Sequence, residues 1–446
     1  METRRHAKLT GVTHELKDPD LVVSSILNRS ADEPVCILDS CSSRHGDSRL
    51  LLAGIEPVRI TEVPAHADAN ACLHAIEAAV SGGKAVFFTI SYDLGPKLLG
   101  IQSRHASLEP LVFMAEFRRL LKFDHETKRG VVIGSNTTSP SVNYNEDPTN
   151  CANNPTEPEI SVRSDFSRAE YLAAVEEIRE RIRDGVTYQT NLTQKLIAEL
   201  PDALTPEEVF QRLRKHHPAP FSAFMRRKDS TVISASPERF FKVSSDKNGK
   251  RTIRTSPIKG TRPRGTTPHE DERLKSELLS SEKDRAENTM IVDLLRNDIG
   301  RICEFGSVRV ERLCEIEEHP TYFNLVSTIA GDLRDGVSIS DILRAVFPCG
   351  SITGAPKIST MRIIDRIERG PRGLSMGAIG YYIPESFGVG ERLDLSVAIR
   401  TMTVHGRHAE FNVGGGITID SDPAAEYDET LVKATALLDA INGKLT

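Results

Sequence analysis

A lysine held between two residues that restrict the backbone is the first candidate for chemistry in this sequence. Lys259 lies between Ile258, which follows Pro257, and Gly260. Proline fixes one backbone dihedral and glycine permits conformations that other residues avoid, so we expect a strand end that runs into a turn. A lysine in such a stiff segment can be partly desolvated, which favours the neutral amine that a nucleophile needs. On spacing alone, the alternative is an ordinary turn lysine.

Two acidic pairs, each with a spacing of three residues, are candidates for a metal site. Asp284 and Glu287 lie in one predicted helix, and Glu426 and Glu429 lie near the start of another. Residues three apart share a helix face, so each pair can direct two carboxylates at one point. Oxygen donors without a nearby cysteine or histidine suit a hard cation such as Mg²⁺. For either pair alone, the alternative is a surface position, because the start of a helix favours acids.

Three further features are suited to bind or protonate a small anion. The triplet Gly414-Gly415-Gly416 follows a predicted strand, and its backbone N–H groups could converge on a carboxylate, with a tight turn as the alternative. Arg400 and Lys433 carry positive charge, although a lone cation is more often solvated. Glu238 follows Ser-Pro at a predicted strand end, where a general acid with a raised pKa is expected. Its alternative is a surface salt bridge with Arg239.

The elements that must position these residues predict an α+β chain with much antiparallel pairing. Residues 1–135 alternate short apolar runs with turns and form an N-terminal α+β part. Residues 136–165 are rich in Ser, Thr, Asn, Pro and Glu, and predict a linker or a long exposed insertion. Residues 166–446 carry every candidate above. In this part we expect a helix at 325–329 and a strand at 409–413 that ends at the glycine triplet.

Composition and charge argue against several functions. The chain of 446 residues is 39% hydrophobic and 27% charged, which is ordinary for a globular protein. Its net charge of -6 and the absence of a basic recognition motif argue against nucleic-acid binding. We expect no membrane span and no secretion signal, because no apolar run is long enough and none follows Arg4 and Arg5. Seven cysteines without C-x-x-C spacing favour a reducing cytoplasm.

Taken together, the motifs resemble in order those of the chorismate-utilising enzymes. This family includes anthranilate synthase component I, aminodeoxychorismate synthase component I, isochorismate synthase and salicylate synthase. The first half of the chain matches loosely, through residues 38–40 and 91–94. The resemblance implies a large unit similar to anthranilate synthase component I, with packed antiparallel β-sheets and helices outside. The dense matches are residues 236–240, 257–265, 284–301, 350–357, 377–381 and 398–400, the glycine triplet and Glu426-x-x-Glu429.

The resemblance also implies roles for the candidate residues. It implies that Mg²⁺ joins the ring carboxylate of chorismate to Glu287 and Glu429, with Asp284 and Glu426 close by. The other implied roles are binding of the ring carboxylate (Gly414, Gly415, Gly416 and Lys433), binding of the enolpyruvyl carboxylate (Arg400, with Tyr381 nearby), further substrate contacts (Thr261 and Gln189), and catalysis (Glu238, which protonates the departing C4 hydroxyl, and Lys259).

Two positions favour one branch of this family. Gln189 stands where the isochorismate and salicylate enzymes carry a water-activating lysine, which argues against water as the nucleophile. Lys259 completes the PIKGT sequence of the aminodeoxychorismate synthases, where anthranilate synthases usually read PIAGT. The resemblance therefore implies Mg²⁺-dependent amination of chorismate to 4-amino-4-deoxychorismate, the first step toward para-aminobenzoate and folate. Anthranilate synthase component I is the alternative.

Three departures from the family leave questions open. Asn324 replaces a histidine used in aromatisation, Asp284 replaces a common glutamate, and Asp39 replaces the glutamate of a tryptophan-binding motif. Tryptophan binding at an N-terminal site therefore stays open. The sequence contains no cysteine elbow of a glutamine amidotransferase, so we expect ammonia from a partner subunit or from solution. A non-catalytic chorismate-binding subunit is a further alternative, but it would lack Glu238 or a metal-side glutamate.

Overall fold

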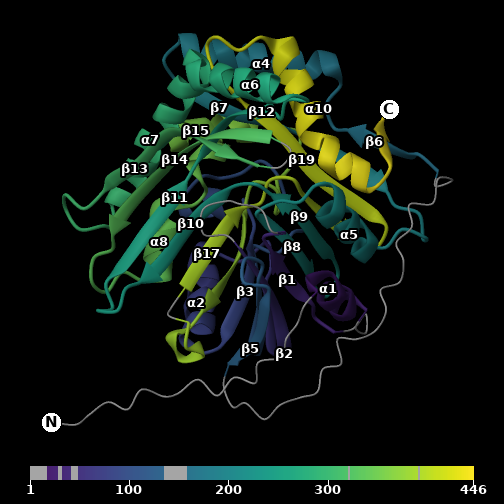
Figure 1. The fold of residues 1–446 in the computed structure, drawn as a ribbon. Helices are drawn as coiled ribbons and strands as arrows, with labels where there is room; N and C mark the ends of the chain where they lie inside the picture. Colours follow the sequence, from purple (N-terminus) through teal and green to yellow (C-terminus); the bar gives the residue numbers. More distant parts are fainter. Residues whose placement is uncertain (1–17, 29–32, 42–48, 135–157, 320–321, 390–391) are drawn as a thin grey trace.

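Apolar runs in both halves of the chain form strands that pair almost entirely antiparallel. The computed structural model describes residues 18–28, 33–41, 49–134, 158–319, 322–389 and 392–446. Within these ranges all strands join one hydrogen-bonded network, whose single parallel pairing links β20 (Gly443–Leu445) to β6 (Ile160–Ser164). Helices cover its outside (Figure 1). The predicted α+β class, with antiparallel sheets and outer helices, is confirmed.

The elements follow the apolar and capping patterns of the sequence. The N-terminal part contains α1 (Pro19–Leu27), β1 (Cys36–Asp39), β2 (Leu50–Val63), α2 (Ala69–Ser81), β3 (Ala85–Ile90), α3 (Leu94–Leu98), β4 (Val112–Asp124) and β5 (Arg129–Gly134). After β6 come α4 (Arg168–Arg183), β7 (Gln189–Glu199), α5 (Pro206–His216), β8 (Phe221–Arg226), β9 (Thr231–Ser236), β10 (Arg239–Ser245), β11 (Arg251–Ser256), β12 (Ile258–Pro263), α6 (Pro268–Ser280), α7 (Glu282–Gly300), β13 (Arg309–Glu318) and β14 (Tyr322–Asp332). The remainder is α8 (Ile339–Val346), the 3-10 turn Gly350–Ile352, β15 (Gly354–Ala355), α9 (Lys357–Ile367), β16 (Ala378–Ile383), the 3-10 turn Glu385–Phe387, β17 (Arg392–Val397), β18 (Thr401–His405), β19 (His408–Ile417), α10 (Pro423–Ala440) and β20.

Strands from the two halves of the chain pair directly. β1 lies between β2 and β8, and β3 lies between β4 and β16. One large apolar core joins residues of α2, α7 and α8 to the strands, and a second joins α1, α5 and α10 to them. In Figure 1 the first group of helices lies toward the left and the second toward the right. Among the described helices, none is long and apolar enough to cross a membrane.

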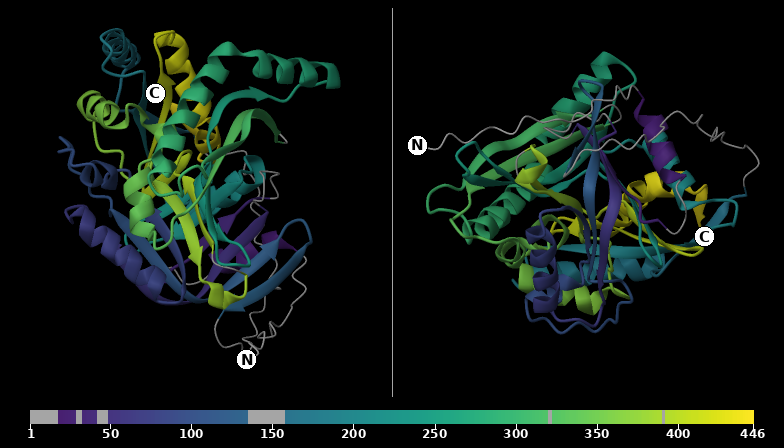
Figure 2. Two further views of the ribbon diagram at one scale, coloured as in Figure 1. Left: turned by 90° about the vertical axis from the view of Figure 1, so that its left-hand side faces the viewer. Right: turned by 90° about the horizontal axis from the view of Figure 1, so that it is seen from below.

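Several predicted elements need correction. Residues 325–329 lie in strand β14 and not in a helix, because their buried apolar side chains are packed within a sheet between β12 and β13. The helix predicted for Asp284 and Glu287 is α7, and it is separate from α6 because Ser281 ends α6 and caps α7 (Figure 2, left). Most of the expected linker lies outside the described residues, but its final part includes strand β6, which pairs with β7.

Candidate active site

Lys259 lies inside strand β12 and not at the predicted turn. The pairing of β12 with β14 shifts register between Lys259 and Thr261, and Gly260 adopts a left-handed φ of 75°. A side chain at Gly260 would collide with α7, because an added Cβ would lie 2.8 Å from Cγ of Asp284. Gly260 thus lets the strand approach α7, where the Lys259 Nζ atom lies 3.9 Å from Oε2 of Glu287.

The glycine triplet forms part of strand β19 and not the tight turn that was its alternative interpretation. Its residues pair with Asn191, Leu192 and Thr193 of β7, so their backbone groups belong to a strand ladder. A Cβ at Gly415 would lie 3.1 Å from Oε2 of Glu426, and one at Gly416 would lie 3.1 Å from Nζ of Lys259. The glycines therefore leave space beside the acids and the lysine. At these residues β19 pairs, among the described strands, with β7 alone, so alternate N–H groups point away from the ladder, and binding of a carboxylate by the triplet stays a prediction.

Both predicted acid pairs lie near the N-terminal ends of their helices, α7 and α10. Among the described residues, no three acidic, histidine or cysteine side chains are arranged to hold a metal ion. Each acid faces a cation instead: Glu287 faces Lys259 (3.9 Å), Glu426 faces Lys283 (3.4 Å), Glu429 faces Lys433 (2.7 Å) and Asp284 faces Arg262 (3.3 Å).

We call these four acids together the acid cluster (Asp284, Glu287, Glu426 and Glu429). The cluster offers only carboxylate oxygens, which a hard cation prefers, so its donor chemistry fits Mg²⁺. Glu426 is only 3% exposed and accepts a hydrogen bond from the Ser421 hydroxyl at 2.6 Å. The four carboxylates face four positively charged side chains. A bound divalent cation would neutralise part of the carboxylate charge in place of these side chains.

The charges around the acid cluster affect its members differently. Burial raises the pKa of Glu287, against the opposing effects of Lys259 and Lys283. Burial also opposes ionisation of Glu429, but the adjacent Lys433 outweighs it and holds the pKa of Glu429 below its ordinary value. Lys433 further donates a hydrogen bond to the Gly414 carbonyl at 2.9 Å. It is thereby fixed between α10 and the glycine triplet.

Glu238 has the environment of a general acid. It is 5% exposed, and burial raises its pKa to about 7 despite hydrogen bonds from Ser351 and the Ile258 backbone and the nearby charge of Lys259. One oxygen, Oε1, has no hydrogen-bond partner among the described residues. The alternative interpretation, a surface salt bridge between Glu238 and Arg239, is not found among the described residues, where Arg239 pairs with Asp394. Glu238 is therefore protonated in part near neutral pH and retains an unused acceptor.

Strand β7 contributes polar atoms that the sequence reading largely missed. Within the described chain, Gln189 Oε1, Thr190 Oγ1 and Asn191 Nδ2 are buried without a hydrogen-bond partner. The amide of Gln189 lies against Gly416, and Asn191 pairs with Gly416 in the sheet. Of the three residues, only Gln189 was predicted. Because buried polar groups are normally satisfied, these orphaned atoms indicate where a polar ligand would bind.

Arg400 lies near the far end of the β12–β14 pair. It follows β17 with a left-handed φ of 48°, and its guanidinium carbon lies 6.0 Å from the Tyr322 ring. Burial lowers its pKa, and the described residues supply no carboxylate partner for it. Thr261 donates a hydrogen bond at 2.9 Å to Asn324, the residue that replaces the family histidine. A half-buried guanidinium without an acid is suited to a substrate carboxylate.

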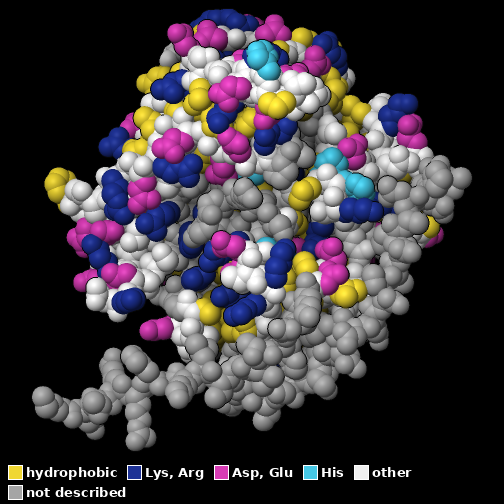
Figure 3. All heavy atoms as spheres, viewed as in Figure 1, with side chains coloured by type: hydrophobic (Ala, Val, Ile, Leu, Met, Phe, Trp, Pro, Cys, Tyr) yellow, Lys and Arg dark blue, Asp and Glu magenta, His cyan; other side chains and the backbone are white. Residues whose placement is uncertain are grey.

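Tyr381 does not join Arg400, contrary to the prediction. On β16 its side chain points into a separate cavity of about 50 Å³ whose lining includes Asp39, Phe221, Lys242 and Arg392. Burial raises the pKa of Tyr381 well above its ordinary range. Lys and Arg side chains gather at the lower centre of the face drawn in Figure 3. The alternation of side chains along β16 explains the error, because it turns this residue toward the N-terminal part.

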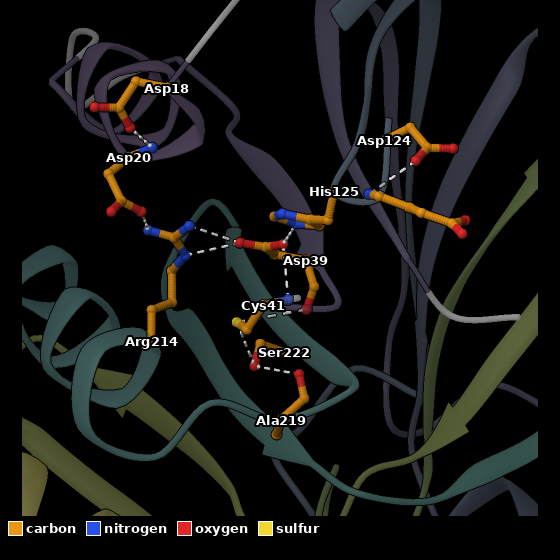
Figure 4. Close-up of polar contacts among 10 residues, drawn as sticks. Asp18, Asp20, Asp39, Cys41, Asp124, His125, Arg214, Ala219 and Ser222 are labelled. Atoms are coloured by element: carbon orange, nitrogen blue, oxygen red, sulfur yellow. Dashed lines mark hydrogen bonds and ion pairs between the residues drawn. The ribbon is translucent and has the colours of Figure 1, made fainter. Parts of the chain in front are cut away.

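Asp39 at the end of β1 accepts hydrogen bonds at both of its carboxylate oxygens (Figure 4). Oδ1 accepts from His125 Nε2 at 2.6 Å and from the Cys41 backbone N–H at 2.9 Å. Oδ2 accepts from Arg214 Nη2 at 2.7 Å and Nε at 2.9 Å. Burial opposes ionisation, but the His125 hydrogen bond and the Arg214 charge outweigh it and lower the pKa of Asp39.

Comparisons with known proteins agree with this architecture. The family model for chorismate binding enzymes matches residues 39–439, so the chain belongs to that family. The crystal structure of anthranilate synthase component I from Streptococcus pneumoniae TIGR4 superposes with a TM-score of 0.71 and 27% identity, over 88% of this chain and 93% of that one. The predicted similarity of the fold to anthranilate synthase component I is thereby confirmed.

Curated relatives with similar sequence identity to this chain carry two different names. An anthranilate synthase component 1 of Haloarcula marismortui is 44% identical over 287 residues, covering 64% of this chain and 55% of the relative. The aminodeoxychorismate synthase component 1 of Klebsiella aerogenes is 44% identical over 276 residues, covering 62% of this chain and 58% of the relative. The matches thus span little more than half of each relative, and overall identity does not separate the two activities.

Proposed function

We propose that this chain aminates chorismate at C4 to give 4-amino-4-deoxychorismate, toward para-aminobenzoate and folate. The observation that carries the proposal is the position of Lys259. Its amine lies beside Glu287 and close to Gly416, against which the Gln189 amide also lies, and its charge acts on Glu238. A nucleophilic amine and a general acid therefore share one site.

Substrate binding would use the charges and orphaned polar atoms of the site. Glu287 and Glu429, with Asp284 and Glu426 near them, would hold Mg²⁺, which supplies positive charge to a ring carboxylate when bound. The half-buried Arg400 would bind the enolpyruvyl carboxylate. The unpaired atoms of Gln189 and Asn191, which share one face of β7, would bind hydroxyl or ammonia groups, whereas Thr190 lies on the opposite face.

The proposed chemistry balances as two displacements. The amine of Lys259 first gives its proton to solvent and then attacks ring carbon C2, the ring double bonds shift, and the C4–O bond breaks as protonated Glu238 gives its proton to the departing hydroxyl, releasing water. Ammonia then forms the new bond at C4, the double bonds return, and the C2–N bond to Lys259 breaks. Glu238 recovers a proton from the attacking nitrogen. The sum is chorismate plus ammonia giving aminodeoxychorismate plus water.

Ammonia would come from a glutamine amidotransferase partner subunit. The component 1 names of the curated relatives support a two-component arrangement. We expect the chain alone to use ammonium salts and to require an added partner to use glutamine. Glutamine-driven turnover by the purified chain alone would contradict this division of labour.

Anthranilate synthesis is the second candidate, favoured by relatives named anthranilate synthase component 1. It requires ammonia at C2 and elimination of pyruvate. Asn324, which bonds Thr261, has no ionisable group to move the proton that aromatisation releases. The para product therefore has better support from the site than the ortho product.

Product analysis tests the proposal. The full chain is incubated with chorismate, Mg²⁺ and ammonium, and products are separated by chromatography and identified by mass spectrometry. We expect 4-amino-4-deoxychorismate, and anthranilate as the main product would overturn the proposal. Lys259→Ala should lose para-directed activity, whereas Lys275→Ala, on the surface of α6, should not. Full para-directed activity in Lys259→Ala would eliminate the covalent route, and a chorismate-derived adduct on Lys259 in peptide mass spectrometry would support it.

A further inference from the structure

Lys283 occupies a position where a cation is locally unfavourable. It is the second residue of α7, whose N-cap is Ser281. The N-terminal end of a helix carries partial positive charge, so a lysine in the first turn opposes helix stability. Residues that break a local rule often serve a different purpose. The reason for Lys283 must therefore come from what its amine reaches outside α7.

The Lys283 amine reaches from α7 to α10. Its Nζ atom lies 3.4 Å from Oε1 of Glu426, a carboxylate that is otherwise 3% exposed. Glu287 and Glu429 also attract the Lys283 charge. One lysine thus supplies charge to acids from both helices. These are the acids that the proposed function assigns to Mg²⁺.

Lys283 differs from the other cations of the acid cluster because less holds it in place. Lys433 also binds the Gly414 carbonyl, and Arg262 also binds Glu277 and the Thr261 carbonyl. In the described part of the chain, Glu426 is the sole hydrogen-bond partner of Lys283, whose side chain is 51% exposed. Its amine can move into solvent without breaking another contact.

We propose that Lys283 is a built-in counter-ion, which neutralises the acid cluster in the metal-free protein and withdraws into solvent when Mg²⁺ binds. This inference rests on the proposed function for the identity of the metal. Removing the lysine charge should have two opposite effects. The metal-free protein loses stability, because like charges on α7 and α10 face each other with less compensation. Mg²⁺ binds more tightly, because it no longer displaces a competing cation.

The experiment compares wild type, Lys283→Met, Lys283→Arg and the control Lys275→Met, all as the full chain. Lys275 forms an ion pair with Glu318 at 2.7 Å on the outer surface of α6. Melting is recorded in EDTA, and Mg²⁺ affinity is measured by calorimetry without substrate. We expect Lys283→Met to melt lower in EDTA and to bind Mg²⁺ roughly 1.5- to fivefold more tightly, the range for a partly exposed ion pair. Lys283→Arg and Lys275→Met should bind Mg²⁺ like wild type.

Three outcomes would overturn the inference. Unchanged or weaker Mg²⁺ binding by Lys283→Met would exclude competition between lysine and metal. Unchanged melting in EDTA would exclude the counter-ion role. Absence of Mg²⁺ binding by wild type and all variants would overturn it as well, whatever product the chain makes. Tighter Mg²⁺ binding in Lys283→Met combined with no aminated product would support this inference and refute the proposed function, so the two failures are distinguishable.

Discussion

Asp39 and Glu238 are both carboxylates buried at strand ends, yet their surroundings are opposite. Asp39 binds a histidine, an arginine and a backbone N–H group, and its pKa is lowered (Figure 4). Glu238 keeps one oxygen without a partner, and burial raises its pKa to about 7. A fully satisfied carboxylate stabilises the fold in one charge state. A carboxylate with an unused oxygen can exchange a proton with a substrate. The number of oxygens without a hydrogen bond is therefore the difference between the Asp39 and Glu238 regions that bears on function.

The largest expected effect is loss of Mg²⁺-dependent activity in Glu287→Gln and in Glu429→Gln. Each change should reduce activity by roughly 10²-fold or more, because it removes a proposed metal ligand. Melting in EDTA should stay near the wild-type value, since repulsion within the acid cluster is also reduced. The matched control is Glu282→Gln, an exposed acid in the first turn of α7. Unchanged Mg²⁺ dependence in both site variants would contradict the metal assignment.

Glu238→Gln should reduce turnover by about 10²- to 10⁴-fold, the usual contribution of a general acid. The amide keeps the shape of the side chain and cannot supply the proton. Because it also removes a buried ionisable group, we expect the melting temperature at pH 8 to be unchanged or higher. A variant with normal turnover would place Glu238 with Asp39 as a structural carboxylate. Turnover is measured from chorismate with saturating ammonium and Mg²⁺.

Asp39→Asn should lower stability by up to about 3–5 kcal/mol, because it leaves the Arg214 charge with only the exposed Asp20 as its acid. Arg214 also contacts Asp20 of α1 at 3.0 Å, so the change weakens the packing of α1 and α5 together. Activity per folded molecule should stay within about twofold, since no substrate contact is removed. Denaturant unfolding measures the first effect, with Glu126→Gln as the exposed control. A large activity loss without loss of stability would contradict a structural role.

The sequence predicted the fold class better than the geometry of the site. The caps Ser167 and Asp422 and the buried run Ala85–Ile90 act locally, so elements of this kind can be read from the sequence. The strand at 325–329 was missed because its neighbours in the sheet are distant in sequence. Tyr381 was misplaced because a strand's facing depends on tertiary register, and the orphaned atoms of β7 become visible only once the sheet is formed.

The two carboxylates should also give stability profiles of opposite sign with pH. The pKa of Glu238 is raised, so its stabilising contribution is present below the ordinary value near 4.5 and is lost as the pH rises through about 7. The pKa of Asp39 is lowered, so its contribution is present above the ordinary value near 3.8 and is lost as the pH falls through the folded value. Melting curves from pH 3 to 9 test this. Glu238→Gln should reduce the change of melting temperature with pH on the high-pH side only. Asp39→Asn should reduce it on the low-pH side only. Identical slopes in both variants would contradict the assignment.

The smallest expected effect concerns free tryptophan, whose binding near Asp39 the sequence left open. An amino acid would need an unused carboxylate for its ammonium group, but His125, Cys41 and Arg214 occupy both oxygens of Asp39. The adjacent cavity of about 50 Å³ holds only a few water molecules. Lys242 and Arg392 also line it, and they repel each other and any further cation. We therefore expect millimolar tryptophan to leave the melting temperature and turnover unchanged, with chorismate and Mg²⁺ as the positive control. A saturable shift of the melting temperature by tryptophan that disappears in Asp39→Asn would show that the ion pairs at Asp39 open for a ligand. Asp39 would then also be available to a ligand, and it would differ less from Glu238 than we infer.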